Sequence, residues 1–295
     1  MPSASCTRTL DFDALVGDDA VPDAGTAPTF QPEALLPSLG LDGGFSCRTR
    51  TPPVVFCDDF ESEPLEAIWD EVLSAPRDGG VVAREPGDSV SPRTGLRVSV
   101  AEGIPAGTYV SMGLHEALPA SAASRTLAID FDLKVEALDP KPGRDIVAFQ
   151  LLLGDGDGDG ERDGERNQLV LDLQSAGGGS VRARFNENLL AADGSSLDAT
   201  LHELAMQPVT GSWAHVSFLL DVRAPSGGKN QVALRIGPRD GAPSQAVKLF
   251  EGPLKHALRG GQPHMEVGIP WLSTAELTAP WRIRYDNVLV RIREE

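Results

Sequence analysis

The sequence predicts an all-β protein, built as a sandwich or jelly roll of antiparallel strands. Short segments in which apolar and polar residues alternate recur along most of the chain, and this period of two is typical of strands. Glycine and proline, which punctuate turns, number 31 and 23 among 295 residues. No long segment between the alternating stretches repeats at the helical period. Many short strands joined by many turns are therefore expected.

Residues 1–45 are expected to form a disordered tether before the folded domain. Aspartates are mixed there with Pro, Gly, Ala and Thr, and apolar residues recur at neither the helical nor the strand period. Such a composition cannot bury enough surface to offset the entropy of the chain. About forty flexible residues have an r.m.s. reach of about 35 Å. The tether would hold a sandwich domain of residues 46–295 clear of a membrane surface.

Three cysteines indicate the compartment. Cys47 and Cys57 lie ten residues apart around a Pro-Pro turn, a separation suited to a disulfide in an oxidising environment. Cys6 follows Ser3-Ala4-Ser5, and small residues before a cysteine are typical of the end of a bacterial lipoprotein signal, although the apolar segment of such a signal is missing. We therefore expect an extracellular or outer-surface protein with a lipid anchor at Cys6. The alternative is an incidental free thiol.

The strands of the domain are predicted from alternation. The clearest segment, 125–136, has one apolar and one charged face, as in an antiparallel sheet with one solvated side. Residues 65–73 carry apolar residues at helical spacing, which predicts a short helical turn leading into a strand or a helix of three turns. The other predicted strands cover 54–61, 80–84, 95–100, 108–114, 145–153, 168–174, 181–186, 215–222, 231–236, 245–251, 264–269 and 281–292.

The composition excludes some functions. The hydrophobic fraction of 41% is enough to build a core, and the sequence has no run of 18 apolar residues that could span a membrane as a helix. Lys and Arg number 26 against 43 Asp and Glu, which gives a net charge of −17. Such a surface repels phosphate backbones and anionic bilayers. Nucleic acid is therefore not an expected partner, and a membrane is expected only through the lipid anchor.

Three short motifs follow one another along the chain. They are Phe56-Cys57-Asp58-Asp59-Phe60-Glu61, Gly211-Ser212-Trp213-Ala214-His215-Val216 and Arg284-Tyr285-Asp286-Asn287-Val288. In this order and spacing they resemble the concanavalin A-like (laminin G-like) jelly-roll domains of bacterial surface lipoproteins, over about residues 46–295. The resemblance implies two curved sheets, adjacent first and last strands, and often a carbohydrate ligand.

The last predicted strand changes phase at Asp286-Asn287, which predicts a β-bulge. In the resembling family a structural calcium is often held between the first and last strands. Carried over to this chain, Glu61 and Asp286 would be its carboxylate ligands, with Asp58 or Asp59 nearby. The alternative is an Asp/Asn turn whose side chains bind their own backbone.

Residues 154–166 form a second candidate calcium site. Asp155, Asp157, Asp159 and Asp163 stand at positions 1, 3, 5 and 9 of a calcium-binding loop. Arg166 occupies the position of the bidentate glutamate, and the flanking segments are predicted strands rather than helices. The alternatives are weak calcium binding and an acidic loop that is extended by the repulsion of its carboxylates. Calcium is the one cofactor that the sequence suggests.

No complete catalytic constellation is recognised in the sequence, so an enzyme is not expected. The one array of carboxylates is Asp130-x-Asp132-x-Lys134-x-Glu136. Glycoside hydrolases of the resembling superfamily carry Glu-x-Asp-x-Glu on one strand. Here Asp replaces the first Glu and Lys replaces the third, which leaves no placed acid/base pair. A solvated strand face explains the array, and a degenerate polysaccharide hydrolase or lyase is the alternative.

A polar strand face is the remaining candidate site. Gln168 and Asp172 on one predicted strand, with Arg182 and Arg184 on the next, offer donors and acceptors suited to sugar hydroxyls or carboxylates. Trp271 would supply a platform on which a sugar ring stacks. A plain solvated sheet is the alternative. The leading hypothesis is a monomeric, non-catalytic surface protein that binds a glycan or another extracellular partner, and a purely structural surface protein is its rival.

Overall fold

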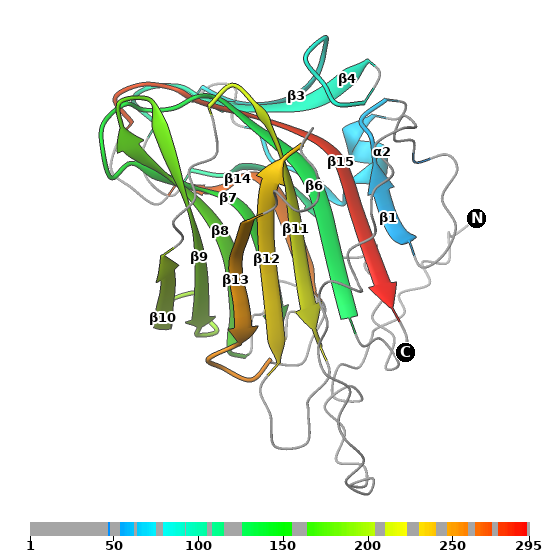
Figure 1. Ribbon diagram of the computed structural model, residues 1–295, viewed down its shortest axis with the longest axis vertical. Helices are drawn as coiled ribbons and strands as arrows, with labels where there is room; N and C mark the ends of the chain where they lie inside the picture. Colours follow the sequence, from blue (N-terminus) through cyan, green and yellow to red (C-terminus); the bar gives the residue numbers. More distant parts are fainter. Residues whose placement is uncertain are drawn as a thin grey trace, which may run out of the picture.

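The structure, a computed structural model, describes residues 47, 54–61, 64–74, 79–91, 93–104, 108–114, 126–154, 164–203, 210–222, 230–239, 247–258, 263–272 and 277–293. Two antiparallel sheets pack face to face, and their strands curve (Figure 1). The predicted jelly-roll sandwich is therefore confirmed. The predicted tether and its boundary at residue 45 lie outside the described residues and stay predictions, as does the role of Cys6. Within the described part of the chain, no helix is long and apolar enough to cross a membrane.

Eight strands form the first sheet. Seven of them follow one another across the sheet, and β1 (Val54–Asp58) pairs with β15 beside β4. The order of the seven is β13 (Val247–Pro253), β12 (Gln231–Pro238), β11 (Trp213–Asp221), β6 (Thr126–Ala137), β15 (Trp281–Arg293), β4 (Thr94–Val100) and β3 (Gly80–Pro86).

Seven strands form the second sheet. Their order is β10 (Ser196–Glu203), β9 (Ser180–Leu190), β8 (Arg166–Gly177), β7 (Asp145–Gly154), β14 (His264–Leu272), β5 (Val110–Leu114) and β2 (Glu71–Val72). The short helix α2 (Leu65–Ile68) precedes β2, so the helical turn leading into a strand is confirmed and the three-turn helix is wrong. The pattern looked helical because Leu65 and Trp69, both buried, follow each other at that spacing and then enter an extended segment.

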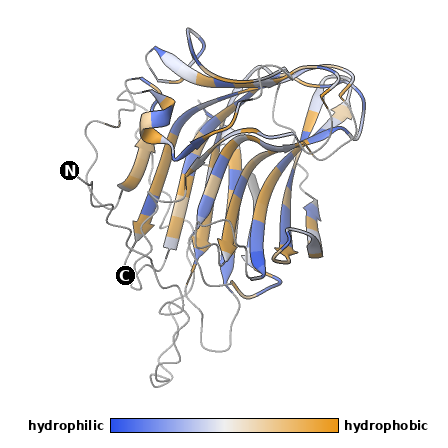
Figure 2. Ribbon diagram, turned by 180° about the vertical axis from the view of Figure 1, so that it is seen from behind, coloured by the Kyte–Doolittle hydropathy of each residue, from blue (hydrophilic) through white to orange (hydrophobic). Residues whose placement is uncertain are grey.

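The core lies between the two sheets. Hydrophobic and hydrophilic bands alternate along the strands in Figure 2, and the hydrophobic set fills the space between the layers. Phe131 packs against Phe149 and Tyr285 with ring centroids 5.5 and 6.0 Å apart. The Tyr285 hydroxyl donates to the carbonyls of Ala148 and Gly268 on the opposite sheet. The buried tyrosine therefore satisfies its polar atom while it links the layers.

The predicted bulge in the last strand is confirmed. The register of β15 against β6 shifts between Asp286 and Leu289, and Asn287 has a positive φ of 54°. The neighbour on the other side changes at the same place, because Trp281–Tyr285 pairs with β4 and Val288–Arg291 pairs with β1. The first and last strands are adjacent, as the resemblance implied.

Candidate functional site

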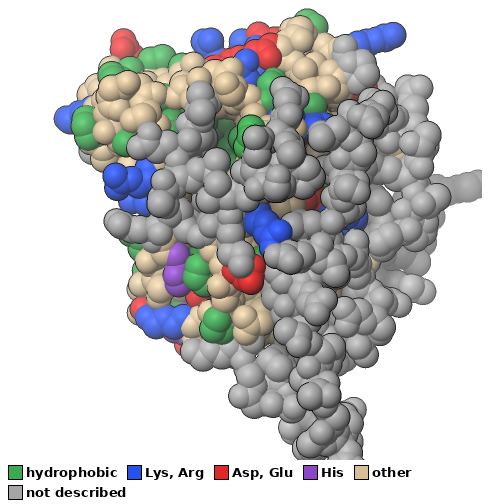
Figure 3. Space-filling view, in the orientation of Figure 1, with side chains coloured by type: hydrophobic (Ala, Val, Ile, Leu, Met, Phe, Trp, Pro, Cys, Tyr) green, Lys and Arg blue, Asp and Glu red, His purple; other side chains and the backbone are tan. Residues whose placement is uncertain are grey.

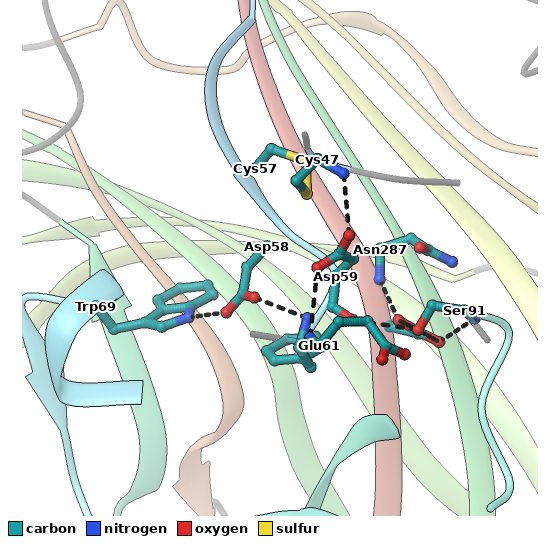
Figure 4. Close-up of a disulfide and its surroundings, with 10 residues drawn as sticks. Cys47, Cys57, Asp58, Asp59, Glu61, Trp69, Ser91 and Asn287 are labelled. Atoms are coloured by element: carbon teal, nitrogen blue, oxygen red, sulfur yellow. Dashed lines mark hydrogen bonds between the residues drawn. A yellow bond between two sulfur atoms is a disulfide. The ribbon is translucent and has the colours of Figure 1, made fainter. Parts of the chain in front are cut away.

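Glu61 and Asp286, the proposed calcium ligands, both accept hydrogen bonds from the segment that connects β3 to β4. Figure 4 shows Glu61 near Ser91 of that segment. Oε1 of Glu61 accepts from the backbone N–H groups of Arg93 and Thr94 at 2.7 and 2.9 Å. Oδ2 of Asp286 accepts from the N–H groups of Val90 and Ser91, both at 2.7 Å. N–H donors turn their positive ends toward these oxygens, which counts against a cation at the same atoms. Calcium binding by the two carboxylates stays a prediction.

The second candidate calcium site, the acidic loop of residues 154–166, is separate in the sequence from Glu61 and Asp286. Asp155, Asp157, Asp159 and Asp163 lie outside the described residues, so calcium binding there stays a prediction. No group of three or more His, Cys, Asp or Glu side chains in the described ranges is arranged to hold a metal ion.

The segment around Cys57 is structural. Cys47 and Cys57 form the predicted disulfide, and Asp59 accepts a hydrogen bond from the backbone N–H of Cys47 at 3.0 Å (Figure 4). Asp58 is buried and accepts from Nε1 of Trp69 at 2.8 Å. Burial raises the pKa of Asp58, against the hydrogen bonds that lower it. These contacts anchor the end of β1.

The carboxylate array of β6 lies on the outer face of the eight-stranded sheet, the side turned away from the core. The prediction of a solvated face is wrong there, because Asp130 and Asp132 are only 3% and 1% exposed. Asp132 contacts Nδ1 of His215 at 2.9 Å and Nε of Arg239 at 3.1 Å, and Asp130 pairs with Arg291. Cations from other strands thus neutralise the aspartates, which a single strand cannot reveal.

The rest of this array is paired in the same way. Lys134 binds Asp88, and Arg284 binds Glu136 with Nε at 2.5 Å from Oε1. Acidic and basic side chains also lie together at the top of Figure 3, where β3 and β4 lie. Arg97 of β4 pairs with Glu85 of β3 at 2.6 Å. This face therefore carries a network of ion pairs.

His215 belongs to this network. Burial lowers its pKa, but hydrogen bonds and charges from Asp130 and Asp132 outweigh burial and raise the pKa to about 9. The imidazolium is thus part of the charge balance that allows two aspartates to be buried side by side.

The outer face of the seven-stranded sheet has a different chemistry. Leu169, Leu171 and Leu173 of β8 point into the core, and the residues that alternate with them point outward. The register places Asp172 opposite Arg184 and Val147, and Val147 opposite Trp271. The predicted binding residues thus share this face, which Gln168, Asp172, Arg182, Arg184 and Trp271 all line. Their role as ligand contacts stays a prediction.

A row of hydrogen-bonded side chains crosses five strands of this face. Asn188 donates from Nδ2 to Gln168 at 2.9 Å, and Gln168 donates from Nε2 to Gln150 at 2.7 Å. Gln150 in turn donates from Nε2 to Oε1 of Glu266 at 2.9 Å, while Ser111 donates from Oγ to Oε2 at 3.1 Å. We call these five residues the amide row. All its donors run toward one carboxylate.

Glu266, where the amide row ends, lies near two more titratable groups. Its Oε1 is 3.3 Å from Nε2 of His264. A β-carbon added at Gly113 would lie 3.0 Å from Nε2 of His264 and 3.5 Å from Oε2 of Glu71. Gly113 therefore leaves the space into which the side chains of His264 and Glu71 extend.

Of the two predicted arginines on this face, Arg184 is paired with aspartates and Arg182 lies away from the amide row. Arg184 contacts Asp145 at 2.6 Å and Asp172 at 3.4 Å through Nη2. Burial raises the pKa of Asp172 to about 7, although the charge of Arg184 lowers it. Arg182 is exposed and stands opposite Gln174, one row further from Glu266.

Exposed apolar side chains flank the amide row. Tyr109 and Trp271 are 44% and 39% exposed, and their rings meet edge to face with centroids 5.2 Å apart. At the other end, Leu201 of β10 is 45% exposed and stands opposite Asn186. Half-exposed aromatic rings beside polar side chains are typical of surfaces that receive sugar rings.

Sequence reasoning missed Gln150, Glu266 and His264. Gln150 lies in the segment 145–153, which is apolar enough to predict burial on both faces, and Glu266 lies between two core residues of β14. The signal that could have found them is a single polar residue within an apolar strand, since such a residue has to find a polar partner on a neighbouring strand.

Comparisons with known proteins agree with the fold. No protein-family model matches the sequence, and neither does any curated protein. The structure of an alginate lyase from Aplysia kurodai is similar, with a TM-score of 0.58, 10% identity, and coverage of 81% of this chain and 99% of that chain. An endo-β-1,4-glucuronan lyase from the fungus Trichoderma reesei has a TM-score of 0.54 at 12% identity, covering 81% of this chain and 96% of that chain. At these identities the likeness shows the jelly-roll fold alone.

Proposed function

We propose that the protein binds a polysaccharide on the outer face of the seven-stranded sheet and does not cleave it. The observation that carries the proposal is the amide row, which crosses five strands beside the exposed Tyr109–Trp271 pair. Amide and hydroxyl groups donate and accept at once, as sugar hydroxyls do, and aromatic rings stack on the C–H faces of sugars. The similar folds of two enzymes named for polysaccharide cleavage support a carbohydrate ligand.

The direction of the hydrogen bonds in the amide row supports binding without the β-elimination that a lyase performs. A lyase removes the proton beside a uronate carboxylate, and the charge that builds up on that carboxylate has to be met by donors or cations. On this face the row directs its donors to Glu266, a carboxylate of the protein itself. A uronate placed there would meet a like charge.

Display at the outer cell surface, through a lipid on Cys6, is part of the same proposal. The Cys47–Cys57 disulfide supports it, because such bonds persist in oxidising compartments. The tether would then carry a monomeric domain whose outer sheet face meets an extracellular glycan.

Binding to a panel of soluble polysaccharides by isothermal titration calorimetry tests the proposal. Trp271→Ala combined with Gln168→Ala is expected to weaken binding at least about tenfold, because a stacking ring and a row member are removed. Arg282→Ala, a partly exposed side chain of the other sheet, is the matched control and should bind like the wild type. Binding that survives the double variant would refute the proposed face.

Polysaccharide cleavage is a second candidate, favoured by the arrangement of Glu71, His264 and Glu266 around Gly113. Hydrolysis of a glycosidic bond uses one carboxylic acid to protonate the leaving oxygen and one carboxylate to activate water or to attack. Incubation with the same panel and a reducing-sugar assay decides between the two functions. Product that disappears in Glu266→Gln while binding persists would establish an enzyme, and absence of product with wild-type binding supports the binding protein.

A further inference from the structure

The charges on the outer face of the seven-stranded sheet indicate which class of polysaccharide it takes. Glu266 stands near the middle of the face, is 6% exposed, and accepts hydrogen bonds from Gln150 and Ser111. Both of its oxygens accept hydrogen bonds, as the oxygens of a carboxylate do, and Nε2 of His264 lies 3.3 Å from Oε1. An acidic side chain that acts as an acceptor therefore stands on the proposed binding face, where the amide row ends.

The amide row reinforces this polarity. Each of Asn188, Gln168 and Gln150 donates toward the next member in the direction of Glu266. Each primary amide retains a second N–H and an oxygen lone pair, which suit a hydroxyl group that both donates and accepts. A carboxylate can only accept, and near the end of the row it would also approach Glu266.

The arginines in the described part of this face lie away from Glu266. Arg184 is held between Asp145 and Asp172, so two acidic groups share one guanidinium. Arg182 is exposed opposite Gln174, and Arg166 is buried opposite Leu190 at the other end of β8. Neither arginine stands opposite Gln150 or Glu266 in the register.

We infer that the ligand is an uncharged, hydroxyl-rich polysaccharide rather than a polyuronate, an inference that rests on the proposed binding function. The chemistry differs from that of alginate and glucuronan, which the names of the two similar lyases contain. The net charge of −17 acts in the same direction, because it repels a polyanion before contact.

A matched pair of ligands tests the inference. A β-1,4-glucan oligosaccharide and a β-1,4-glucuronan oligosaccharide of equal length differ only in having a hydroxymethyl group or a carboxylate on each ring, and β-1,4-mannan and polymannuronate form a second pair. The neutral member should bind about 10- to 100-fold more tightly, because a carboxylate near Glu266 meets like charge. Its affinity should be unchanged between about 0.05 and 0.5 M NaCl, since no ion pair is screened.

Variants that remove a carboxylate test whether its charge causes the preference for the neutral ligand. Glu266→Gln should reduce the difference in affinity between the neutral and the uronate member of a pair about tenfold, because the uronate carboxylate no longer meets a like charge. Glu71→Gln provides a second removal of negative charge beside the same glycine if the first variant does not fold, as judged by circular dichroism. Tighter binding of the uronate member, weakened by salt, would overturn the inference and leave the binding function standing. Failure of every pair and of the wider panel to bind would overturn both.

Discussion

Gln150 donates a hydrogen bond from Nε2 to Oε1 of Glu266, at 2.9 Å, and so joins β7 to β14 on a face turned away from the core. Both side chains are nearly buried, at 4% and 6% exposure. The pair therefore has its geometry before any ligand arrives. Preorganised donors and acceptors lower the entropy that binding has to offset.

Gln150→Leu should destabilise the fold by about 1.5–3 kcal/mol, because it removes a donor from a buried carboxylate. Urea unfolding followed by circular dichroism measures the change. Gln174→Leu, on the same face of the neighbouring strand but less buried, is the matched control and should change the free energy of unfolding by less than about 1 kcal/mol. Equal losses in the two variants would contradict the role assigned to the pair.

Asp286→Ala should lower the free energy of unfolding by more, about 3 kcal/mol, because the backbone N–H groups of Val90 and Ser91 and the Ser91 hydroxyl lose their common acceptor. The same denaturation experiment measures it. Asp193→Ala removes the carboxylate of a solvent-exposed turn and should leave the unfolding midpoint almost unchanged. A wild-type midpoint in Asp286→Ala would show that the β3–β4 connection is held by other contacts.

Calcium should not stabilise the protein through Glu61. Its oxygen accepts two backbone N–H groups, whose positive ends a cation would have to displace. The shift in melting temperature caused by calcium should therefore be the same in the wild type and in Glu61→Gln. A shift that is present in the wild type and lost in Glu61→Gln would place an ion at that carboxylate after all.

The acidic loop needs a separate measurement. Calorimetric titration with calcium, repeated on Asp157→Ala combined with Asp159→Ala, reports on that loop without involving Glu61. Heat that disappears in the double variant would assign calcium to the loop, and no heat in the wild type would remove that prediction.

Stability should fall as the pH rises from about 7 to 9, on the order of 2–3 kcal/mol. The folded pKa of His215 is raised to about 9, above the ordinary value of 6.5. A histidine with a raised folded pKa contributes stability that is complete below its unfolded pKa and is lost as the pH passes through the folded one. His215→Gln should flatten the dependence in this window, as measured by urea unfolding at several pH values.

Asp172 and Asp286 affect a lower range of pH. Their folded pKa values of about 7 exceed the ordinary 3.8, so the folded state binds more protons between these limits. Stability from these two groups therefore decreases as the pH rises from about 4 to 7. His215→Gln should leave that part of the profile unchanged, which separates the two contributions.

Residues that lie close in sequence carried the successful predictions. The alternation of Leu169, Leu171 and Leu173 predicts β8, and the change of phase at Asp286-Asn287 predicts the bulge. The separation of ten residues between the two cysteines suits the disulfide. Each of these features is decided by neighbours along the chain.

The candidate site could be predicted only in part, because partners far apart in sequence decide it. Gln150 and Glu266 are separated by 116 residues, and only the adjacency of β7 and β14 brings them together. Asp130 and Asp132 looked solvated for the same reason, since the side chains that cover and neutralise them come from other strands. Alternation shows that a strand has a polar face, but it does not show what stands beside that face.

The position of β15 has a consequence for biosynthesis. This strand lies between β6 on one side and β4 and β1 on the other, so the eight-stranded sheet is divided until residues 281–293 have been made. Strands β1, β3 and β4 are synthesised about two hundred residues before β15, which completes their sheet. The hydrogen bond between Ser91 and Asp286 spans a sequence separation of 195 residues. The eight-stranded sheet can therefore be completed only when β15 has been made, after the other strands of the sheet.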